Sequence, residues 1–316
     1  MLKCIAVVVG ALVAAPLVLA QQPPLMRLVV PFPPGGSNDV IARAMAPQLA
    51  KRLGTNVIVE NKSGAAGVIG SDAVAKAPPD GSQLLLTSST YLTTAATQAK
   101  LPYDPLAALV PVAMVAEGPL LVAVPAERPI KTPADLVAAA KAKPGALNYG
   151  TSGVGSLAHL ATELLNGAAS IQMTHVPYKG AGPALIDLAA GQIDVMISNY
   201  SSLVSQMKAG KVRAIAVTSP KPSPAFPDLP PVSSAVPGYA MDIWVTVFAP
   251  AATPPALIER LNKEINEISA SPELRTFLDP DGAQPVALPP AAIAARMKQD
   301  LAQLKRIAAE RKISLD

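Results

Sequence analysis

The stretch LMRLVVPFPPGGSNDVIARAMAPQLAKRLGTNVIVE, from Leu25 to Glu60, decides the fold class. It joins an apolar run rich in β-branched residues, a Pro- and Gly-rich loop, an Ala-rich helical pattern and a second β-branched run. The spacing predicts a strand over 27–31, a helix over 39–53 and a strand over 56–60. A strand, a helix and a strand in this order form the βαβ unit of a parallel sheet covered by helices, so we expect an α/β protein.

The same alternation continues on the C-terminal side of this stretch. The first series adds a helix over 68–76 and a strand over 83–87. A second series predicts strands over 147–149, 173–176, 194–197 and 213–217, with helices over 133–143, 157–167, 183–191 and 203–209. Two further helices, 255–268 and 290–311, carry apolar residues at helical spacing and end the chain.

Two extended apolar segments, 119–125 and 243–250, flank the second series. We expect them to carry the chain out of the first half and back, which divides it into domain 1 (21–122 and 248–316) and domain 2 (123–247). Each domain is then a mostly parallel sheet flanked by helices, and two crossing strands form a hinge between them. Ligands in such folds bind at the carboxyl ends of the strands, so two facing halves would enclose one cleft.

Length and composition agree with a two-domain globular protein. The chain has 316 residues, and domains average about 150 residues. Half of the residues are hydrophobic, 15% are charged, and the 34 prolines are spread between apolar blocks, which argues against disorder. Aromatic residues make up 3%, and the net charge of +4 is dispersed along the chain. A nucleic-acid binder would need aromatic stacking platforms and a clustered basic stripe, so this class is disfavoured.

The first twenty residues are expected to be a cleaved signal peptide. Lys3 is followed by an uninterrupted apolar run from Ile5 to Ala20, and cleavage is expected after Ala20. A membrane anchor is the alternative interpretation, but the run falls short of the roughly 20 residues needed to span a bilayer. Cys4 precedes the run and would leave with the signal, so the mature chain would have no thiol and no disulfide.

The loop PFPPGGSND, Pro31 to Asp39, lies between the first strand and the first helix. Gly35 and Gly36 permit close approach of a ligand, and the helix N-terminus offers unpaired N–H groups at the positive end of the helix dipole. The loop is therefore either an anion-binding site or a stiff turn capped by Ser37 or Asn38. We interpret Asp39 as a cap, because its charge would otherwise repel an anion.

A second loop, YGTSGVGS from Tyr149 to Ser156, takes the same position in the second series. Thr151, Ser152 and Ser156 supply hydroxyl groups, and the two glycines let backbone amides converge on an anion. The loop lacks the lysine of a phosphate-binding P-loop and the glycine spacing of the dinucleotide motif, which disfavours nucleotides. It also narrowly misses the GxSxG pattern of serine hydrolases.

The histidines give little support for catalysis. His159 and Glu163 are four residues apart on an expected helix, but no HExxH pattern or cysteine supports a metal site there. His159 is instead expected to help fix the preceding loop, and His175 is expected to be structural. An exported serine hydrolase that uses Ser152 or Ser156 with His159 is the competing functional class. The sequence favours binding, with no catalytic residue, cofactor or metal ion.

Three further sites complete the sequence-based candidates. TSST, Thr87 to Thr90, ends an expected strand and offers hydroxyl groups to the same cleft, and Asn199 ends a strand in the second series. Both are alternatively ordinary polar exits from strands. Trp244, the single tryptophan, lies in the returning segment and is expected to be in the core.

From about Arg27 to its end, the chain resembles the Bug family, the extracytoplasmic solute receptors of tripartite tricarboxylate transporters. Six ordered motifs carry the resemblance: VVPFPPGGSND (29–39), VIVENKSGAAGVIG (57–70), PDG (79–81), LPYDP (101–105), GSLAHLATEL (155–164) and HVPYKG with GQIDVM (175–180 and 191–196). The chain departs from the family pattern at Ser63 and Thr246, and it lacks the usual Glu near Ser234.

The resemblance implies a two-domain periplasmic receptor of the Venus-flytrap type, which closes around a small di-, tri- or aromatic carboxylate. In the family, backbone amides of the loop matching 32–37 hold a ligand carboxylate, with donors from the other domain. The ligand-binding residues expected from the loops and the resemblance together are Phe32, Pro34, Gly35, Gly36, Ser37, Ser88, Ser89, Thr90, Thr151, Ser152, Gly155, Ser156, His159 and Asn199.

The expected partners follow from the same resemblance. They are membrane subunits of a transporter or the outer domain of a sensor kinase, and we expect the receptor to be a monomer. Asn199 is neutral, which favours a carboxylate without an amine.

Overall fold

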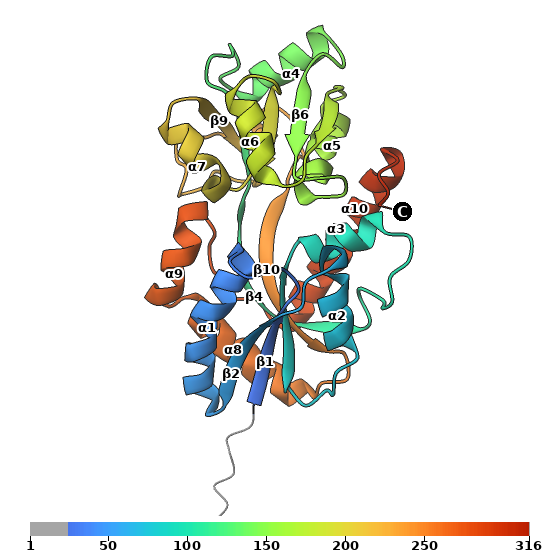
Figure 1. The fold of residues 1–316 in the computed structure, drawn as a ribbon, viewed down its shortest axis with the longest axis vertical. Coiled ribbons are helices and arrows are strands. Elements are labelled where there is room, and N and C mark those ends of the chain that lie inside the picture. Colours follow the sequence, from blue (N-terminus) through green and yellow to red (C-terminus); the bar gives the residue numbers. More distant parts are fainter. Residues whose placement is uncertain (1–24, 316) are drawn as a thin grey trace, which may run out of the picture.

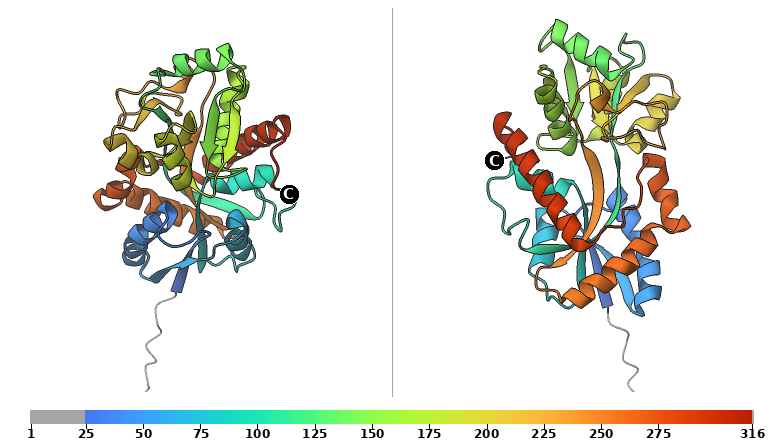
Figure 2. Two further views of the ribbon diagram at one scale, coloured as in Figure 1. Left: turned by 45° about the horizontal axis from the view of Figure 1, so that its top comes forward. Right: turned by 180° about the vertical axis from the view of Figure 1, so that it is seen from behind.

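The computed structural model describes residues 25–315, which form two lobes, one above the other in Figure 1. The expected signal peptide (1–20) and Cys4 lie outside the described residues. Long strands run between the lobes, and the view from behind in Figure 2 shows the last helix reaching from the lower lobe toward the upper one. Within residues 25–315, no helix has the length and hydropathy needed to cross a membrane.

The lower lobe is built on a five-stranded sheet of order β2-β1-β3-β10-β4. Its strands are β1 (Leu25–Val30), β2 (Asn56–Asn61), β3 (Gln83–Ser88), β4 (Leu109–Pro119) and β10 (Asp242–Pro250). β1 is parallel to β2 and β3, whereas β10 is antiparallel to β3 and β4. Its helices are α1 (Ser37–Leu53), α2 (Val68–Ala75), α3 (Thr90–Thr97), α8 (Pro255–Ser269), α9 (Pro272–Leu278) and α10 (Pro290–Glu310), with short 3-10 turns η1 (Ala65–Gly67) and η3 (Asp279–Asp281).

The upper lobe is built on a second five-stranded sheet of order β7-β6-β8-β5-β9. Its strands are β5 (Leu121–Pro125), β6 (Asn148–Thr151), β7 (Thr174–Pro177), β8 (Val195–Ser198) and β9 (Val212–Val217). β6 is parallel to β7 and β8, and β5 is antiparallel to β8 and β9. Its helices are α4 (Pro133–Ala142), α5 (Leu157–Ala168), α6 (Ala181–Ala189) and α7 (Tyr200–Lys208), with a 3-10 turn η2 (Val232–Ser234).

Burial explains why the sequence of the opening stretch folds as it does. Leu28, Val29 and Val30 of β1 are fully buried, as expected for a strand covered by helices on both faces of its sheet. Burying each such side chain contributes about 1.5–3 kcal/mol. α1 ends at Gly54, whose φ of +66° places it in the left-handed conformation that closes helices. The strand, helix and strand expected over 27–60 are confirmed.

The crossing segments are tied together at Thr218, which is fully buried. Its hydroxyl accepts a hydrogen bond from the N–H of Leu120 (2.7 Å) and donates to the carbonyl of the same residue (3.1 Å). The carbonyl of Thr218 accepts the N–H of Met241 (3.0 Å). The outgoing and returning chains are therefore joined where they pass between the lobes.

The structure adds elements that the sequence patterns did not predict. These are α3, α9 and the first ten residues of β4. Strand pairing places residues 121–122 in the upper sheet and 242–247 in the lower sheet, a few residues from the expected domain boundaries. The division of the chain into two domains at those boundaries stays a prediction.

Candidate functional site between the lobes

Helix N-termini from both lobes face one another across the space between the sheets. In the lower lobe, α1 and α3 follow the parallel strands β1 and β3, and in the upper lobe α5, α6 and α7 follow the parallel strands β6, β7 and β8. Figure 1 shows β1 running up from the N-terminal end and β6 pointing down toward it. Each helix N-terminus carries partial positive charge and unpaired N–H groups, so this arrangement suits a small anion.

The N-terminus of α1 is open. Gly36 takes the N-cap position with φ −76° and ψ 167°, and no side chain caps the helix there. Capping by Ser37 or Asn38, one of the two interpretations of this loop, is therefore wrong. The loop reaches this point through Gly35, whose φ of +87° is strongly disfavoured for other residues. Gly35, Gly36 and Ser37 are exposed, and because the Gly35 N–H is bound by Asp39, Gly36 and Ser37 are the residues whose backbone is open to a ligand.

Asp39 lies in the first turn of α1, and its negative charge is balanced by Arg43 and by hydrogen bonds from neighbouring groups. Its side chain is 3% exposed and accepts hydrogen bonds from the Gly35 N–H (2.9 Å), Arg43 Nε (2.9 Å) and Asn61 Nδ2 (2.9 Å). The hydrogen bond from Arg43 is the main cause that lowers the pKa of Asp39 to about 2, against the opposing effect of burial. The contact with Gly35 gives Asp39 a capping role, and the open end of α1 stays positive.

A cavity of about 280 Å³, here called the cleft cavity, lies at the N-terminus of α1 and reaches the upper lobe. Its volume lies just below the roughly 300–1,000 Å³ of drug-sized sites, which suits a small metabolite. The lining residues are Gly35, Ser37, Asn38, Val40, Ile41, Ala116, Asn199, Ser201, Ile243, Val245, Phe277, Leu278, Asp281 and Ala283. The cavity thus brings together three of the expected ligand residues: Gly35, Ser37 and Asn199.

Asn38 contributes an unpaired amide to this cavity. Its side chain is 7% exposed, and it makes no hydrogen bond within the part of the chain that the structure describes. The amide atoms of Asn38 are not among the fully enclosed, unpaired polar atoms of residues 25–315, so the amide reaches the cavity and can bind water or a ligand there. The sequence indicated Asn38 only as a possible helix cap. Its position in the lining of the cavity, which makes it a candidate ligand donor, is visible only in the structure.

A carboxylate of the lower lobe contacts the N-terminus of α7 in the upper lobe. Asp281 accepts hydrogen bonds from the Ser201 N–H (2.6 Å), the Ser201 hydroxyl (3.0 Å) and Asn199 Nδ2 (3.4 Å). Sequence reasoning missed both Asp281 and Ser201, because 80 residues separate them and only the fold joins them. One N-terminus of the cleft is therefore already occupied by an acidic side chain of the protein itself.

The loop after β6 is folded on itself. Thr151 is fully buried, and its hydroxyl donates to the Gly153 carbonyl (3.1 Å), accepts the Gly153 N–H (3.2 Å) and bonds His175 Nε2 (2.7 Å). A hydroxyl has one donor and two acceptor positions, so these contacts use all of them. Ser152 is exposed, and the hydroxyl of Ser156 accepts the His159 N–H (3.3 Å) as the N-cap of α5.

The two histidines support this loop from behind. His159 Nδ1 accepts the Gly155 N–H (3.2 Å), and the His159 and His175 rings stack with centroids 3.8 Å apart. Burial lowers the pKa of each histidine to about 4, and the neighbouring ring lowers that of His175 further. Both rings are therefore neutral at neutral pH, as the stacking requires. The expected role of His159 in fixing the loop is confirmed by its bond to Gly155.

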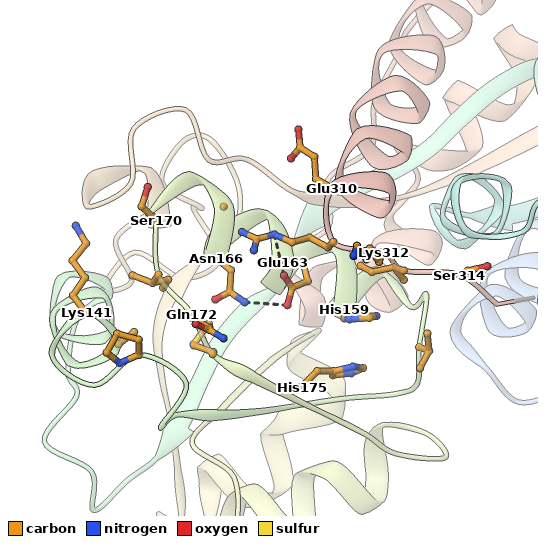
Figure 3. A pocket seen from close by; sticks show the side chains of 18 residues that line it. Lys141, His159, Glu163, Asn166, Ser170, Gln172, His175, Glu310, Lys312 and Ser314 are labelled. Atoms are coloured by element: carbon orange, nitrogen blue, oxygen red, sulfur yellow. Dashed lines mark hydrogen bonds and ion pairs between the residues drawn. The ribbon is translucent and has the colours of Figure 1, made fainter.

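A wider hollow of about 960 Å³, the α5 groove, lies behind these histidines, between the upper lobe and the end of α10 (Figure 3). It is lined by Ala140, Lys141, Pro144, Val154, His159, Glu163, Asn166, Gly167, Ser170, Ile171, Gln172, Met173, His175 and 310–314. Glu163 accepts hydrogen bonds from the Tyr149 hydroxyl (2.6 Å) and Asn166 Nδ2 (3.0 Å), and it pairs with Arg311 (3.3 Å). It does not join His159 as a metal ligand.

The arrangement gives no support to hydrolysis or metal chemistry. Between residues 25 and 315, no cluster of three or more His, Cys, Asp or Glu side chains is placed to hold a metal ion. The ring nitrogen Nδ1 of His159 is engaged by the backbone of Gly155, and the hydroxyl of Ser156 accepts a backbone N–H. Neither contact is the bond between a serine hydroxyl and a histidine ring that activates a nucleophile.

The remaining expected residues lie beside the hinge or under the first loop. Ser89 Oγ accepts the N–H of Trp244 (2.9 Å), and the N–H of Ser89 donates to the carbonyl of the same tryptophan (3.0 Å). Ser88 donates to the Thr90 hydroxyl (3.3 Å). Trp244 is 2% exposed, which confirms its expected place in the core.

In the first loop, the Phe32 carbonyl accepts Asn61 Nδ2 (3.1 Å), and Pro34 is exposed. A ligand role for any of the expected residues stays a prediction.

Comparisons with known proteins extend over nearly the whole chain. Residues 41–313 match the model of the tripartite tricarboxylate transporter family receptor, TctC. Protein BugT of Bordetella pertussis (strain Tohama I) is 38% identical over 268 residues, which cover 84% of this chain and 82% of that protein.

Two solved structures are similar in fold. R. palustris Rpa4515 with adipate is 34% identical, covers 92% of this chain and 98% of its own, and has a TM-score of 0.78. A TctC solute binding protein from Polaromonas is 27% identical, covers 92% and 99%, and has a TM-score of 0.81. The matched family model and these relatives show that the chain belongs to the TctC family of tripartite tricarboxylate transporter receptors, which includes the Bug proteins.

Proposed function

We propose that this chain is a periplasmic, non-catalytic receptor that captures a small organic carboxylate in the cleft cavity by closure of its two lobes. The observation that carries the proposal is the open N-terminus of α1 at the cavity, with Asp39 compensated by Arg43 and Gly35. An anion at this point meets unpaired N–H groups and no free negative charge from its own helix. The R. palustris relative is solved with adipate, an organic acid, which supports a carboxylate as the ligand.

The ligand is held by donors from both lobes. The N-terminus of α1 and the amide of Asn38 bind a carboxylate from below, and Asn199 lines the cavity from above. Ser152 and Ser156 lie outside the lining of the cavity, and their proposed contacts form when the lobes close. Thr151 positions its loop and touches no ligand, since its hydroxyl is fully used within the loop and by His175. Ser89 and His159 hold their own loops by accepting the N–H groups of Trp244 and Gly155. Contacts to the second lobe form only on closure, so the ligand stabilises the closed form over the open one.

The strength of such contacts accounts for useful affinity. Each hydrogen bond to a charged group contributes about 1.5–3 kcal/mol, and a micromolar dissociation constant corresponds to about −8.2 kcal/mol. Association costs several kcal/mol, so four or more such bonds are needed when no arginine is present. Among the residues that line the cleft cavity there is no Lys or Arg, which leaves backbone and amide donors to supply them.

The receptor is expected to be exported by the signal peptide at 1–20, which is then removed. It delivers its ligand to the membrane subunits of a transporter or reports it to a sensor, and it acts as a monomer. These assignments rest on the sequence of the N-terminal segment and on the family.

Thermal unfolding of residues 21–316 against mono-, di- and tricarboxylates, aromatic acids and amino acids tests the proposal. Ligand at about 100 times its dissociation constant adds about 2.7 kcal/mol to the free energy of unfolding, which gives a clear upward shift. Gly36→Val places a branched side chain at the mouth of α1, where φ −76° and open space allow it without strain. We expect this variant to fold and to lose the shift.

Ala291→Val is the matched control, since it adds the same branch to the exposed first turn of α10, away from the cleft. It should keep the full ligand response. A protein that responds to no acid in the panel, and from which denaturation releases no bound acid, would refute the proposed function.

A further inference from the structure

The cleft cavity has two chemically different sides, here called its ends. On the lower-lobe side is the N-terminus of α1, with the unpaired amide of Asn38. On the upper-lobe side are Asn199 and Ser201 at the start of α7, which bind the carboxylate of Asp281. The first end attracts an anion, and the second presents a negative charge. A ligand that spans the cavity therefore meets opposite electrostatic conditions at its two ends.

The rest of the lining, here called the wall, is apolar. It is formed by side chains of α1, of the hinge strands β4 and β10 and of α9: Val40, Ile41, Ala116, Ile243, Val245, Phe277 and Leu278. Phe277 is a large apolar residue that is 48% exposed, and it lies at the rim of this wall. Such a wall favours the hydrocarbon part of a ligand, and Asp281 is the only charged residue that lines the cavity.

Within residues 25–315, Asp281 forms no ion pair, and only the partial positive charge at the N-terminus of α7 offsets its negative charge. Its hydrogen bonds come from one backbone N–H, one hydroxyl and one amide, at Ser201 and Asn199. A carboxylate has about four acceptor positions, so these three bonds leave one for a neutral donor such as a ligand hydroxyl. A second ligand carboxylate at this end would meet a like charge in a partly desolvated space.

We propose that Asp281 is a specificity-determining residue, which makes this receptor select monocarboxylates with an apolar body and reject acids that carry a second carboxylate at the far end. The inference rests on the proposed function and narrows its ligand class. The bound carboxylate lies against α1 and Asn38, the hydrocarbon lies on the apolar wall, and the far end is uncharged or carries a hydroxyl. Adipate, present in the R. palustris relative, belongs to the class that this chain should reject.

Matched acids of equal chain length test this selectivity by isothermal titration calorimetry. The probes are butanoate, hexanoate, octanoate and benzoate against succinate, adipate, octanedioate and terephthalate. For the pair that fits the cavity, we expect the monoacid to bind at least tenfold more tightly than the diacid. Asp281→Asn keeps an acceptor for Ser201 and removes the charge, so it should raise diacid affinity at least tenfold and change monoacid affinity less than threefold.

Asp279→Asn is the matched control. Asp279 lies in the same 3-10 turn and pairs with Arg275 in solvent, outside the cavity lining, so this variant removes one negative charge without touching the site. It should leave all affinities unchanged.

The outcomes separate the inference from the function on which it rests. A wild-type protein that binds diacids more tightly, or an Asp281→Asn variant that changes both classes equally, overturns the selectivity and leaves the receptor function standing. The equal change would identify Asp281 only as a contact between the lobes. Binding of no acid in either series or in the wider panel overturns both proposals.

Discussion

Replacing Asn38 by leucine should make the empty protein more stable and the receptor weaker. Asn38 is 7% exposed, lines the cleft cavity and has no hydrogen-bond partner within residues 25–315. Leucine has a similar size and a good helix propensity at this position, the second residue of α1. The substitution therefore removes a polar group whose burial is unfavourable without a ligand.

The expected magnitudes follow from the same observation. A fully buried unpaired amide costs about 1–3 kcal/mol in proteins, and the amide of Asn38 still reaches the cavity, so the free energy of unfolding should rise by about 1 kcal/mol or less. A hydrogen bond from a neutral amide to a ligand carboxylate contributes about 1.5–3 kcal/mol, and its loss weakens binding by roughly 10- to 150-fold. A residue of the core would change stability in the opposite direction.

Urea unfolding of the ligand-free protein measures the first effect, and calorimetric titration with the acid found in the panel measures the second. Asn262→Leu is the control, because Asn262 donates to the carbonyls of Val112 (2.8 Å) and Leu288 (3.0 Å) and should destabilise the protein without a direct effect on binding. If Asn38→Leu lowers stability, or if it raises stability and leaves affinity unchanged, then the amide is not a ligand donor.

Two predictions concern pH. His159 and His175 have pKa values of about 4 in the folded chain and about 6.5 in the unfolded chain, so the unfolded state binds more protons between pH 4 and 6.5. The free energy of unfolding should therefore fall by up to about 1.4 kcal/mol per pH unit for each histidine as the pH drops from 6.5 to 4. Urea unfolding at several pH values measures this slope, and His175→Gln should roughly halve it. Burial, assisted by Glu117 and Asp300 and opposed by Arg296, raises the pKa of Asp242 to about 7, so the folded chain keeps this proton between pH 4 and 7, where the unfolded chain loses it. The difference in melting temperature between Asp242→Asn and the wild type should therefore grow in favour of the variant from pH 5 to 8. A difference that stays constant over this range would argue against a buried charge at Asp242.

Local sequence patterns were enough to predict the parts of the fold that are locally determined. β1, α1 and β2 arise from apolar periodicity, a Gly-rich start and a glycine stop, and these signals lie within 36 residues of one another. α3 escaped prediction because its sequence TYLTTAAT is rich in threonine, which favours helices weakly. Tertiary contacts overrule this preference, since Tyr91 is buried against the rings of Tyr103 and Phe248.

The candidate site could be predicted only in part, because contacts between residues far apart in the sequence also determine it. Position after a strand and before a helix pointed to Gly35, Ser37 and Asn199, which line the cleft cavity, and their ligand role stays a prediction. The sequence did not reveal which hydroxyl groups the protein uses internally. The hydroxyl of Thr151 forms hydrogen bonds within its own loop and with His175, which lies on the neighbouring strand β7. The partner of the α7 N-terminus, Asp281, comes from 80 residues away and follows from the packing of the two lobes.

Amide NMR of the deuterated, ¹⁵N-labelled receptor, titrated with the acid that gives the largest thermal shift, tests whether the open N-terminus of α1 binds a ligand carboxylate. We expect saturable downfield shifts of the Ser37 and Asn38 backbone amide protons and a shift of the Asn38 side-chain amide, because these groups lie at the cavity. Saturable binding that leaves these amides unmoved and shifts only signals from the α5 groove would contradict this expectation.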